Sequence, residues 1–104
     1  MENKEEIIKK IERALKEVYD PEIPVNIYDL GLVYGIDIDD SYKAKIVMTL
    51  TAPNCPMVDQ LLEDVDIAVN MVAEVRDVAI ELTFDPPWDR SRMSEEALFE
   101  LGLL

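Results

Sequence analysis

The order in which apolar periodicities follow one another is the strongest constraint on how this chain can fold. Apolar residues that recur every three or four positions indicate a helix, and strict alternation indicates a half-buried strand. The chain shows helical spacing, alternation, alternation, helical spacing and alternation over residues 7–18, 32–38, 44–50, 58–72 and 78–84. The sequence therefore predicts a helix, two strands, a second helix and a third strand.

Capping and breaking residues set the limits of the first helix. Asn3 followed by Glu6 has the spacing of a capping box at a helix start. Pro21 disfavours helical backbone in the residue before it. We therefore expect the first helix to begin after Asn3 and to end near Val18 or Tyr19.

A short sixth element is expected near the end of the chain. Ser94 is a favoured helix N-cap, and Gly102 is a common stop signal, so a helix is predicted through Leu101. The order α-β-β-α-β-α occupies 104 residues, a length that suits a single domain over residues 1–104.

The connections predict a three-stranded mixed sheet. The turn residues Asp39, Asp40 and Ser41 favour an antiparallel hairpin of the first two strands, whereas a strand-helix-strand crossover normally makes its two strands parallel. One face of the sheet is apolar in all three strands and is expected under the two longer helices. The result is a two-layer α/β (α+β) fold whose second face is open or pairs with another chain.

Charge and composition restrict the classes of partner. The chain has 23 acidic and 10 basic residues, a formal charge of −13, which opposes binding to nucleic acids and to anionic membranes. Basic proteins or cations fit better, although the acidity alone also keeps a protein soluble. Without a signal-peptide pattern or a long apolar run, the chain is expected to be cytoplasmic.

Cys55 is the only cysteine, and the chain has no histidine. It lies between Pro53 and Pro56 at the predicted start of the second helix, where backbone N–H groups favour a thiolate. A buried, inert thiol is the structural alternative. A cysteine-histidine pair is excluded within the chain, but a redox or acyl-carrying thiol enzyme remains a second hypothesis.

A complete soft-metal site cannot be built from one copy of these side chains. Structural zinc and common iron-sulfur sites use four cysteine or histidine ligands, and Cys55 supplies one. The rest would have to come from a second copy in a homodimer, a partner, a small thiol, or the carboxylates of Asp20 and Glu22. Such a shared site would be labile, as a carrier requires.

Several other residues have both a structural and a functional interpretation. Asp20 and Glu22 flank Pro21 and are either solvated turn residues or site residues, and Asn26 has the same two interpretations. Trp88 either covers the core or recognises a partner. Arg90 and Arg92 stand out in an acidic chain and are expected to pair with nearby surface carboxylates rather than with an acidic partner.

Three separated motifs carry a resemblance to a known family. Residues 20–34 read DPEIPVNIYDLGLVY, and residues 49–56 read TLTAPNCP. Residues 85–88 read DPPW and are followed by Met93-Ser94. In this order they resemble the small family that includes SufT and PaaD, over nearly the whole chain. The resemblance implies a domain akin to the iron-sulfur cluster assembly scaffold fold that works in the maturation of iron-sulfur proteins.

The same resemblance implies roles for particular residues. Cys55 would be the family cysteine that handles iron or a cluster transiently, with Asp20, Glu22 and Thr51 nearby, and the partners would be iron-sulfur client or assembly proteins. Apart from the resemblance, Trp88 and Asn26 are the residues expected to contact a partner. PaaD-like members serve a multicomponent oxygenase and carry a cysteine-rich C-terminal region, which does not follow Leu104, so general maturation is favoured over that accessory role.

Overall fold

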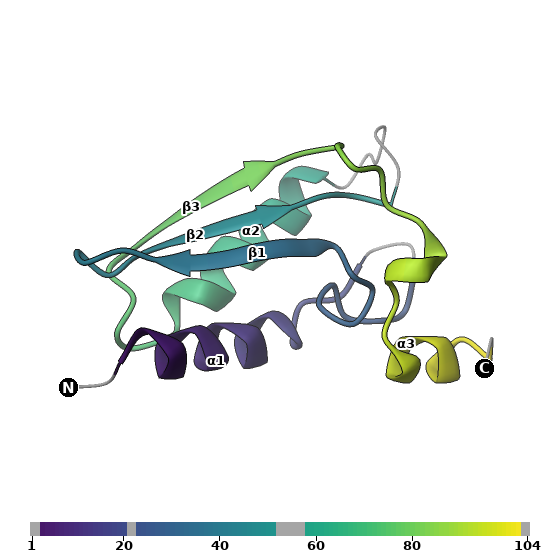
Figure 1. The fold of residues 1–104 in the computed structure, drawn as a ribbon, viewed down its shortest axis with the longest axis horizontal. Coiled ribbons are helices and arrows are strands. Elements are labelled where there is room, and N and C mark those ends of the chain that lie inside the picture. Colours follow the sequence, from purple (N-terminus) through teal and green to yellow (C-terminus); the bar gives the residue numbers. More distant parts are fainter. Residues whose placement is uncertain (1–2, 21–22, 52–57, 103–104) are drawn as a thin grey trace.

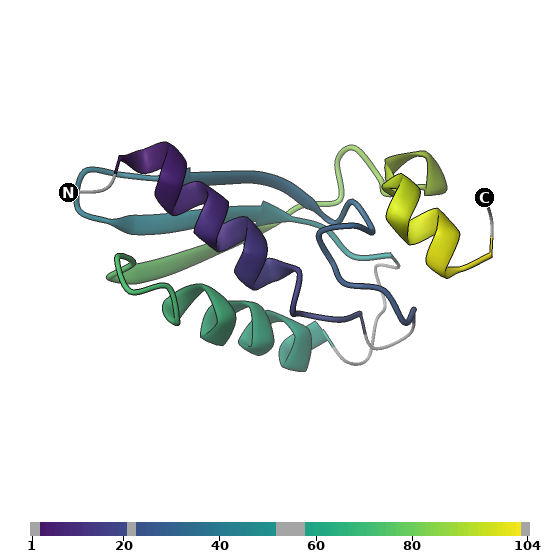
Figure 2. The ribbon, with the colours of Figure 1, turned by 90° about the horizontal axis from the view of Figure 1, so that it is seen from below.

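Two long helices cover one face of a three-stranded sheet in the computed structural model, which describes residues 3–20, 23–51 and 58–102 (Figures 1 and 2). A 3-10 turn, η1, and a short helix follow the sheet at one end. In chain order the elements are α1 (Lys4–Leu15), β1 (Val33–Ile38), β2 (Lys43–Met48), α2 (Val58–Asn70), β3 (Asp77–Leu82), η1 (Arg90–Arg92) and α3 (Glu95–Glu100). This confirms the predicted order α-β-β-α-β-α.

The sheet has the predicted mixed topology, with β2 in the centre. β1 pairs with β2 as an antiparallel hairpin, and β3 lies parallel to β2. Ile36, Ile46 and Ile80 lie opposite one another across the three strands. Because side chains alternate between the two faces of a strand, this register puts the apolar residues of the three strands on the same face, except near the start of β1, where the register shifts between Val33 and Gly35.

The core lies between that face and the two long helices. Ile46 and Ala44 of β2 are fully buried, as are Ile11 of α1 and Val65 of α2, and Leu61 of α2 is only 2% exposed. The isoleucine, leucine and valine side chains gain about 1.5–3 kcal/mol each when they leave water, so the helices are held on the sheet by burial. The expectation that the two longer helices cover one face is confirmed.

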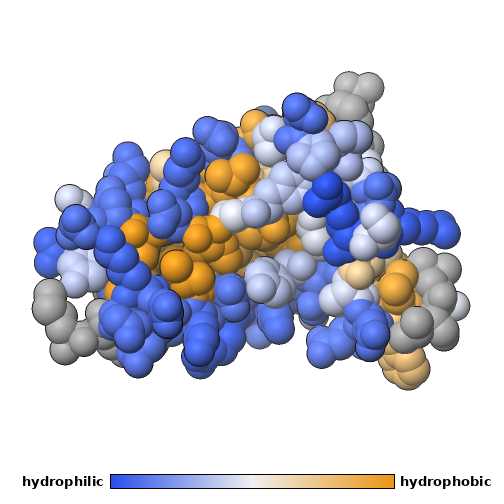
Figure 3. Space-filling view, in the orientation of Figure 1, coloured by the Kyte–Doolittle hydropathy of each residue, from blue (hydrophilic) through white to orange (hydrophobic). Residues whose placement is uncertain are grey.

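The opposite face mixes small apolar and charged side chains. Gly35, Val47 and Ala79 are half-buried there, and the ion pairs Lys43–Asp77 and Lys45–Glu81 join neighbouring strands at 3.8 and 3.7 Å. Exposed pairs of this kind contribute little to stability. An apolar area over β1 and β2, bordered by hydrophilic residues, is visible in Figure 3. No helix of the described residues covers this face.

The predicted end of the first helix is wrong by about one turn. α1 ends at Leu15, because the N–H of Ile27 donates to the carbonyl of Val18 at 2.8 Å and Tyr19 forms a bridge with Asn26. These pairings need extended backbone, so tertiary contacts end the helix before Pro21 can. The third strand likewise ends at Leu82, two residues before its predicted limit.

The predicted helix caps are confirmed. The Oδ1 atom of Asn3 accepts from the N–H of Glu6 at 2.9 Å, and Oγ of Ser94 accepts from the N–H of Ala97 at 3.1 Å. Both contacts satisfy amides that have no partner within the helix. In the described part of the chain, no helix is both long and apolar enough to cross a membrane.

Replacement of Leu61 by Ala should lower the free energy of unfolding by about 2–5 kcal/mol, because a buried side chain is removed and a cavity remains. Ile67→Ala on the same helix is the matched control, since Ile67 is 53% exposed and its loss should cost less than about 0.5 kcal/mol. Urea unfolding followed by circular dichroism measures both. Equal losses for the two variants would contradict the described core.

Candidate functional site

A relay of backbone hydrogen bonds joins the first two motifs at one end of the sheet. The N–H of Ile27 donates to the carbonyl of Val18 at 2.8 Å, the N–H of Leu32 donates to Ile27 at 3.1 Å, and the N–H of Thr49 donates to Leu32 at 2.8 Å. The loop after α1, the approach to β1 and the end of β2 therefore lie side by side (Figure 1).

Asp20 and Thr51 each lie two residues beyond this relay, at the same end of the sheet. Asp20 is 7% exposed, and its Oδ1 atom accepts from the N–H of Ile23 at 3.0 Å. Thr51 is half-buried in a bend after β2. The sequence left open which end of the sheet each segment occupies. Glu22 and Cys55 lie outside the described residues, so their part in this site stays a prediction.

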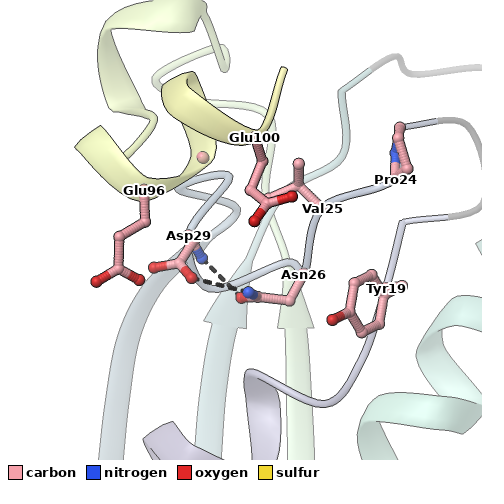
Figure 4. A pocket seen from close by; sticks show the side chains of 8 residues that line it. Tyr19, Pro24, Val25, Asn26, Asp29, Glu96 and Glu100 are labelled. Atoms are coloured by element: carbon pink, nitrogen blue, oxygen red, sulfur yellow. Dashed lines mark hydrogen bonds between the residues drawn. The ribbon is translucent and has the colours of Figure 1, made fainter. Parts of the chain in front are cut away.

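Asn26 holds a tight turn. Its amide nitrogen donates to Oδ2 of Asp29 at 2.8 Å, its amide oxygen accepts from the N–H of Asp29 at 2.9 Å, and its carbonyl accepts from the N–H of Leu30 at 3.1 Å (Figure 4). An asparagine that bonds to backbone three residues on is a typical turn former. The turn interpretation of Asn26 is thus satisfied, while its contact with a partner stays a prediction.

An acidic hollow of about 230 Å³ lies between this turn and α3 (Figure 4). It is lined by Tyr19, Pro24, Val25, Asn26, Asp29, Glu96, Ala97 and Glu100. Its carboxylates favour cations over anions. Within residues 3–20, 23–51 and 58–102, however, no group of three or more histidine, cysteine or acidic side chains could hold a metal ion. Sequence reasoning missed Glu96 and Glu100 as lining residues, because periodicity does not say where a short terminal helix docks.

Trp88 ties the third motif to the first. Its indole N–H donates to the carbonyl of Leu30 at 2.6 Å, its ring packs half-buried against the core, and the N–H of Ser94 donates to the carbonyl of Asp29 at 2.8 Å. Gly31 completes the contact: its φ is +81°, and a Cβ there would lie 2.2 Å from the carbonyl oxygen of Arg92. Trp88 is therefore a tether that also covers the core.

Arg92 stacks on an aromatic ring instead of forming the expected ion pair. Its guanidinium lies 4.7 Å from the centroid of the Tyr34 ring, and the Tyr34 hydroxyl donates to the carbonyl of Pro86 at 2.7 Å. Among the described residues, neither Arg90 nor Arg92 has a carboxylate within 4.0 Å. Neither arginine therefore forms the predicted ion pair in this part of the chain, although the positive charge of Arg92 helps to lower the pKa of the nearby Asp89 carboxyl.

Asp89 accepts hydrogen bonds from both the hydroxyl and the backbone N–H of Ser91 and caps η1. The side-chain hydrogen bond from Ser91, followed by the backbone one, lowers the pKa of Asp89 below its ordinary value of 3.8. Both bonds favour the ionised carboxylate. Asp89 thus orients the turn that carries Arg92.

Gly31→Ala should destabilise the fold strongly. The left-handed backbone alone costs an alanine about 1–3 kcal/mol, and the new methyl group would also collide with the backbone of Arg92. Two other glycines separate these effects. Gly102→Ala keeps a positive φ of +72° with open space around it, whereas Gly35→Ala has ordinary φ and its nearest neighbour at 3.9 Å.

Denaturant unfolding of the three glycine variants should therefore rank the losses as Gly31, then Gly102, then Gly35. A loss for Gly31→Ala no larger than that for Gly102→Ala would contradict the close contact between Gly31 and Arg92.

The contribution of Asp89 to stability should depend on pH. Because its pKa is lowered on folding, its stabilising effect is present above about pH 3.8 and is lost as the pH falls through the folded-state pKa. The gap in thermal midpoint between wild type and Asp89→Ala should therefore close in acid. Ser91→Ala should raise the midpoint of the Asp89 carboxyl titration followed by ¹³C NMR. A midpoint unaffected by Ser91→Ala would refute the hydrogen bond from the Ser91 hydroxyl to Asp89.

Comparison with known proteins identifies similar chains. The model of the family described as "Iron-sulfur cluster assembly protein" matches residues 8–82. A Porphyromonas gingivalis protein named Fe-S protein maturation auxiliary factor is 54% identical over 94 residues, which cover 90% of each chain. The Bacillus subtilis Fe-S protein maturation auxiliary factor YitW is 40% identical over 100 residues, covering 95% of this chain and 98% of that protein.

The fold is also found among solved structures. A domain of unknown function from Bacillus anthracis superposes with a TM-score of 0.91 at 37% identity, covering 97% of this chain and 96% of that chain. Its likeness spans all the elements that carry the three motifs. With the family match over residues 8–82 and relatives similar along nearly their whole length, this chain belongs to the iron-sulfur cluster assembly protein family.

Proposed function

We propose that this protein assists the maturation of iron-sulfur proteins, as a carrier or adaptor whose Cys55 contacts iron, a cluster or a client transiently. The observation that carries the proposal is the convergence of the loop after α1 and the end of β2, with Asp20 and Thr51 at one end of the sheet. Membership of the family and the names of the similar proteins support the general role in maturation.

The donor set is suited to transfer rather than to permanent storage. Iron-sulfur clusters are held mainly by cysteine thiolates, and the chain has one cysteine and no histidine. A bound cluster would need ligands from a second copy, a partner or a small thiol. When ligands are shared in this way, the cluster is released once the molecule that supplies the remaining ligands dissociates.

Asp20 supports this role in two ways. It is almost buried and its carboxylate holds the backbone of Ile23, so it fixes the loop that leads toward β1. Its oxygen atoms are also ligands that iron accepts, and a carboxylate could complement the Cys55 thiolate as iron passes. Thr51 would contribute a hydroxyl from the facing segment.

The carrier hypothesis can be separated from the adaptor hypothesis by two substitutions. Cys55→Ser should abolish the absorption and Mössbauer signals that wild type acquires during anaerobic reconstitution with iron and sulfide, because the only thiolate is lost. Asp20→Asn should reduce the amount of iron retained. Asp40→Asn, an acid at the opposite hairpin turn with a 96% exposed side chain, is the control and should leave loading unchanged.

Client maturation is the second readout. If wild type binds no iron and Cys55→Ser still supports maturation of an iron-sulfur enzyme, the carrier hypothesis is wrong and the adaptor hypothesis remains. If maturation is also unchanged when the chain is omitted, the proposed function itself is wrong. The relatives are named as auxiliary factors, which agrees with the expectation of an assembly factor rather than an enzyme.

A thiol enzyme predicts something different: a lowered Cys55 pKa together with a saturable dependence on substrate. Titration with a small alkylating reagent measures the thiolate fraction directly. An ordinary pKa without such saturation would exclude the enzyme.

A further inference from the structure

A shallow groove of about 560 Å³ lies where β1 begins, against the segment that follows β3. It is lined by Gly31, Val33, Tyr34, Pro86, Ser91 and Arg92. The lining therefore combines apolar and aromatic surface with one cation. Grooves that bind ligands commonly pair apolar walls with a few fixed polar groups.

The walls of this groove are held in place by contacts described above. Tyr34 is fixed through its hydroxyl on Pro86, and Gly31 brings the backbone of the turn directly against Arg92. The segment itself is tethered by Trp88 and capped by Asp89. A surface already ordered before binding loses little conformational entropy when a partner arrives.

Arg92 is the polar group of the groove. Its side chain is exposed and oriented by the Tyr34 ring, and no ion pair engages it in the described part of the chain. The neighbouring carboxylate of Asp89 accepts from the N–H and hydroxyl of Ser91, and it attracts Arg92 electrostatically without an ion pair within 4.0 Å among the described residues. The guanidinium therefore presents donors to an incoming acceptor, and its planar fork matches a carboxylate.

The area next to the groove extends the apolar surface. Val33 lies opposite Met48 at the start of β1, and after a register shift the half-buried Gly35 lies opposite Val47 on the open face of the sheet. Figure 3 shows apolar residues over these strands, with hydrophilic ones at the border. Arginine and tyrosine are enriched among the residues that dominate binding energy at protein interfaces.

We propose that this groove docks a segment of a partner protein that carries apolar side chains and one carboxylate, with Arg92 receiving the carboxylate. The overall charge of −13 argues against a strongly acidic segment, because each added negative charge would be repelled. A single carboxylate avoids most of this cost, since charges more than about 8 Å away are screened at physiological salt. Arg90, exposed on the same turn, adds positive potential.

The test begins with random heptapeptides displayed on phage and selected on the full-length protein. The enriched sequences should hold an aspartate or glutamate beside apolar residues, and synthetic copies should shift the backbone NMR signals of residues 31–35 and 86–92. Arg92→Gln should weaken binding by about ten- to a hundredfold, as expected for loss of a charge-assisted hydrogen bond. Arg13→Gln, on the exposed side of α1, should leave it unchanged.

A double-mutant cycle identifies the pair. Changing the peptide carboxylate to an amide should weaken binding to wild type about as much as Arg92→Gln does, and should cost little more in the Arg92→Gln protein. Arg92→Lys keeps the charge but loses the fork, so its binding should be intermediate. Thermal midpoints confirm that each variant is folded.

Three outcomes would overturn the proposal. The enriched peptides could carry lysine or arginine in place of the acid, they could bind the Arg92→Gln protein as tightly as wild type, or the selection could enrich no peptide sequence at all. Binding by the Cys55→Ser protein should equal that of wild type. The docking groove therefore stands or fails independently of the proposed handling of iron.

Discussion

The end of this molecule that holds the family motifs depends on backbone hydrogen bonds that continue the sheet beyond its named strands. These bonds link, in turn, Val18, Ile27, Leu32 and Thr49. They therefore hold the loop after α1 against the end of β2. Each buried amide and carbonyl needs such a partner, because an unpaired one costs about as much as a lost hydrogen bond. Loops held in this way can present side chains with the precision of a sheet.

The two ends of the sheet serve different purposes. At the hairpin end, Asp39 accepts from the amides of Ser41 and Lys43 and closes a tight turn. The opposite end collects three motifs, a tryptophan tether, a left-handed glycine and stacked Tyr34 and Arg92 side chains. Binding residues concentrate on loops that a rigid scaffold positions, and here the helix-covered sheet is that scaffold.

Local patterns predicted most of the fold. The strands, the hairpin and the parallel crossover follow from periodicity and from the connections, and the caps at Asn3 and Ser94 follow from side-chain chemistry. The end of α1 did not, because Val18 and Tyr19 pair with residues that a helix rule does not consider. The helix propensity of a segment does not decide its structure where a tertiary contact stabilises another conformation more strongly.

The sequence names candidate site residues but does not predict their arrangement. The family motifs identified Asp20 and Thr51, yet only the backbone hydrogen bonds from Val18 to Thr49 bring together the segments that carry them. The stacking of Arg92 on Tyr34 and the bond from Trp88 to Leu30 join positions far apart in sequence. The spacing of these residues in the sequence does not predict that they are in contact.

The contact between Gly31 and Arg92 has a consequence for how the protein can be recognised. These two residues are separated by β1, β2, α2 and β3, so they meet only after the whole sheet and its helices have assembled. A misfolded or partly synthesised chain would lack this contact, even if each motif were intact in sequence. A partner that binds at the contact between Gly31 and Arg92 therefore binds only the fully folded chain.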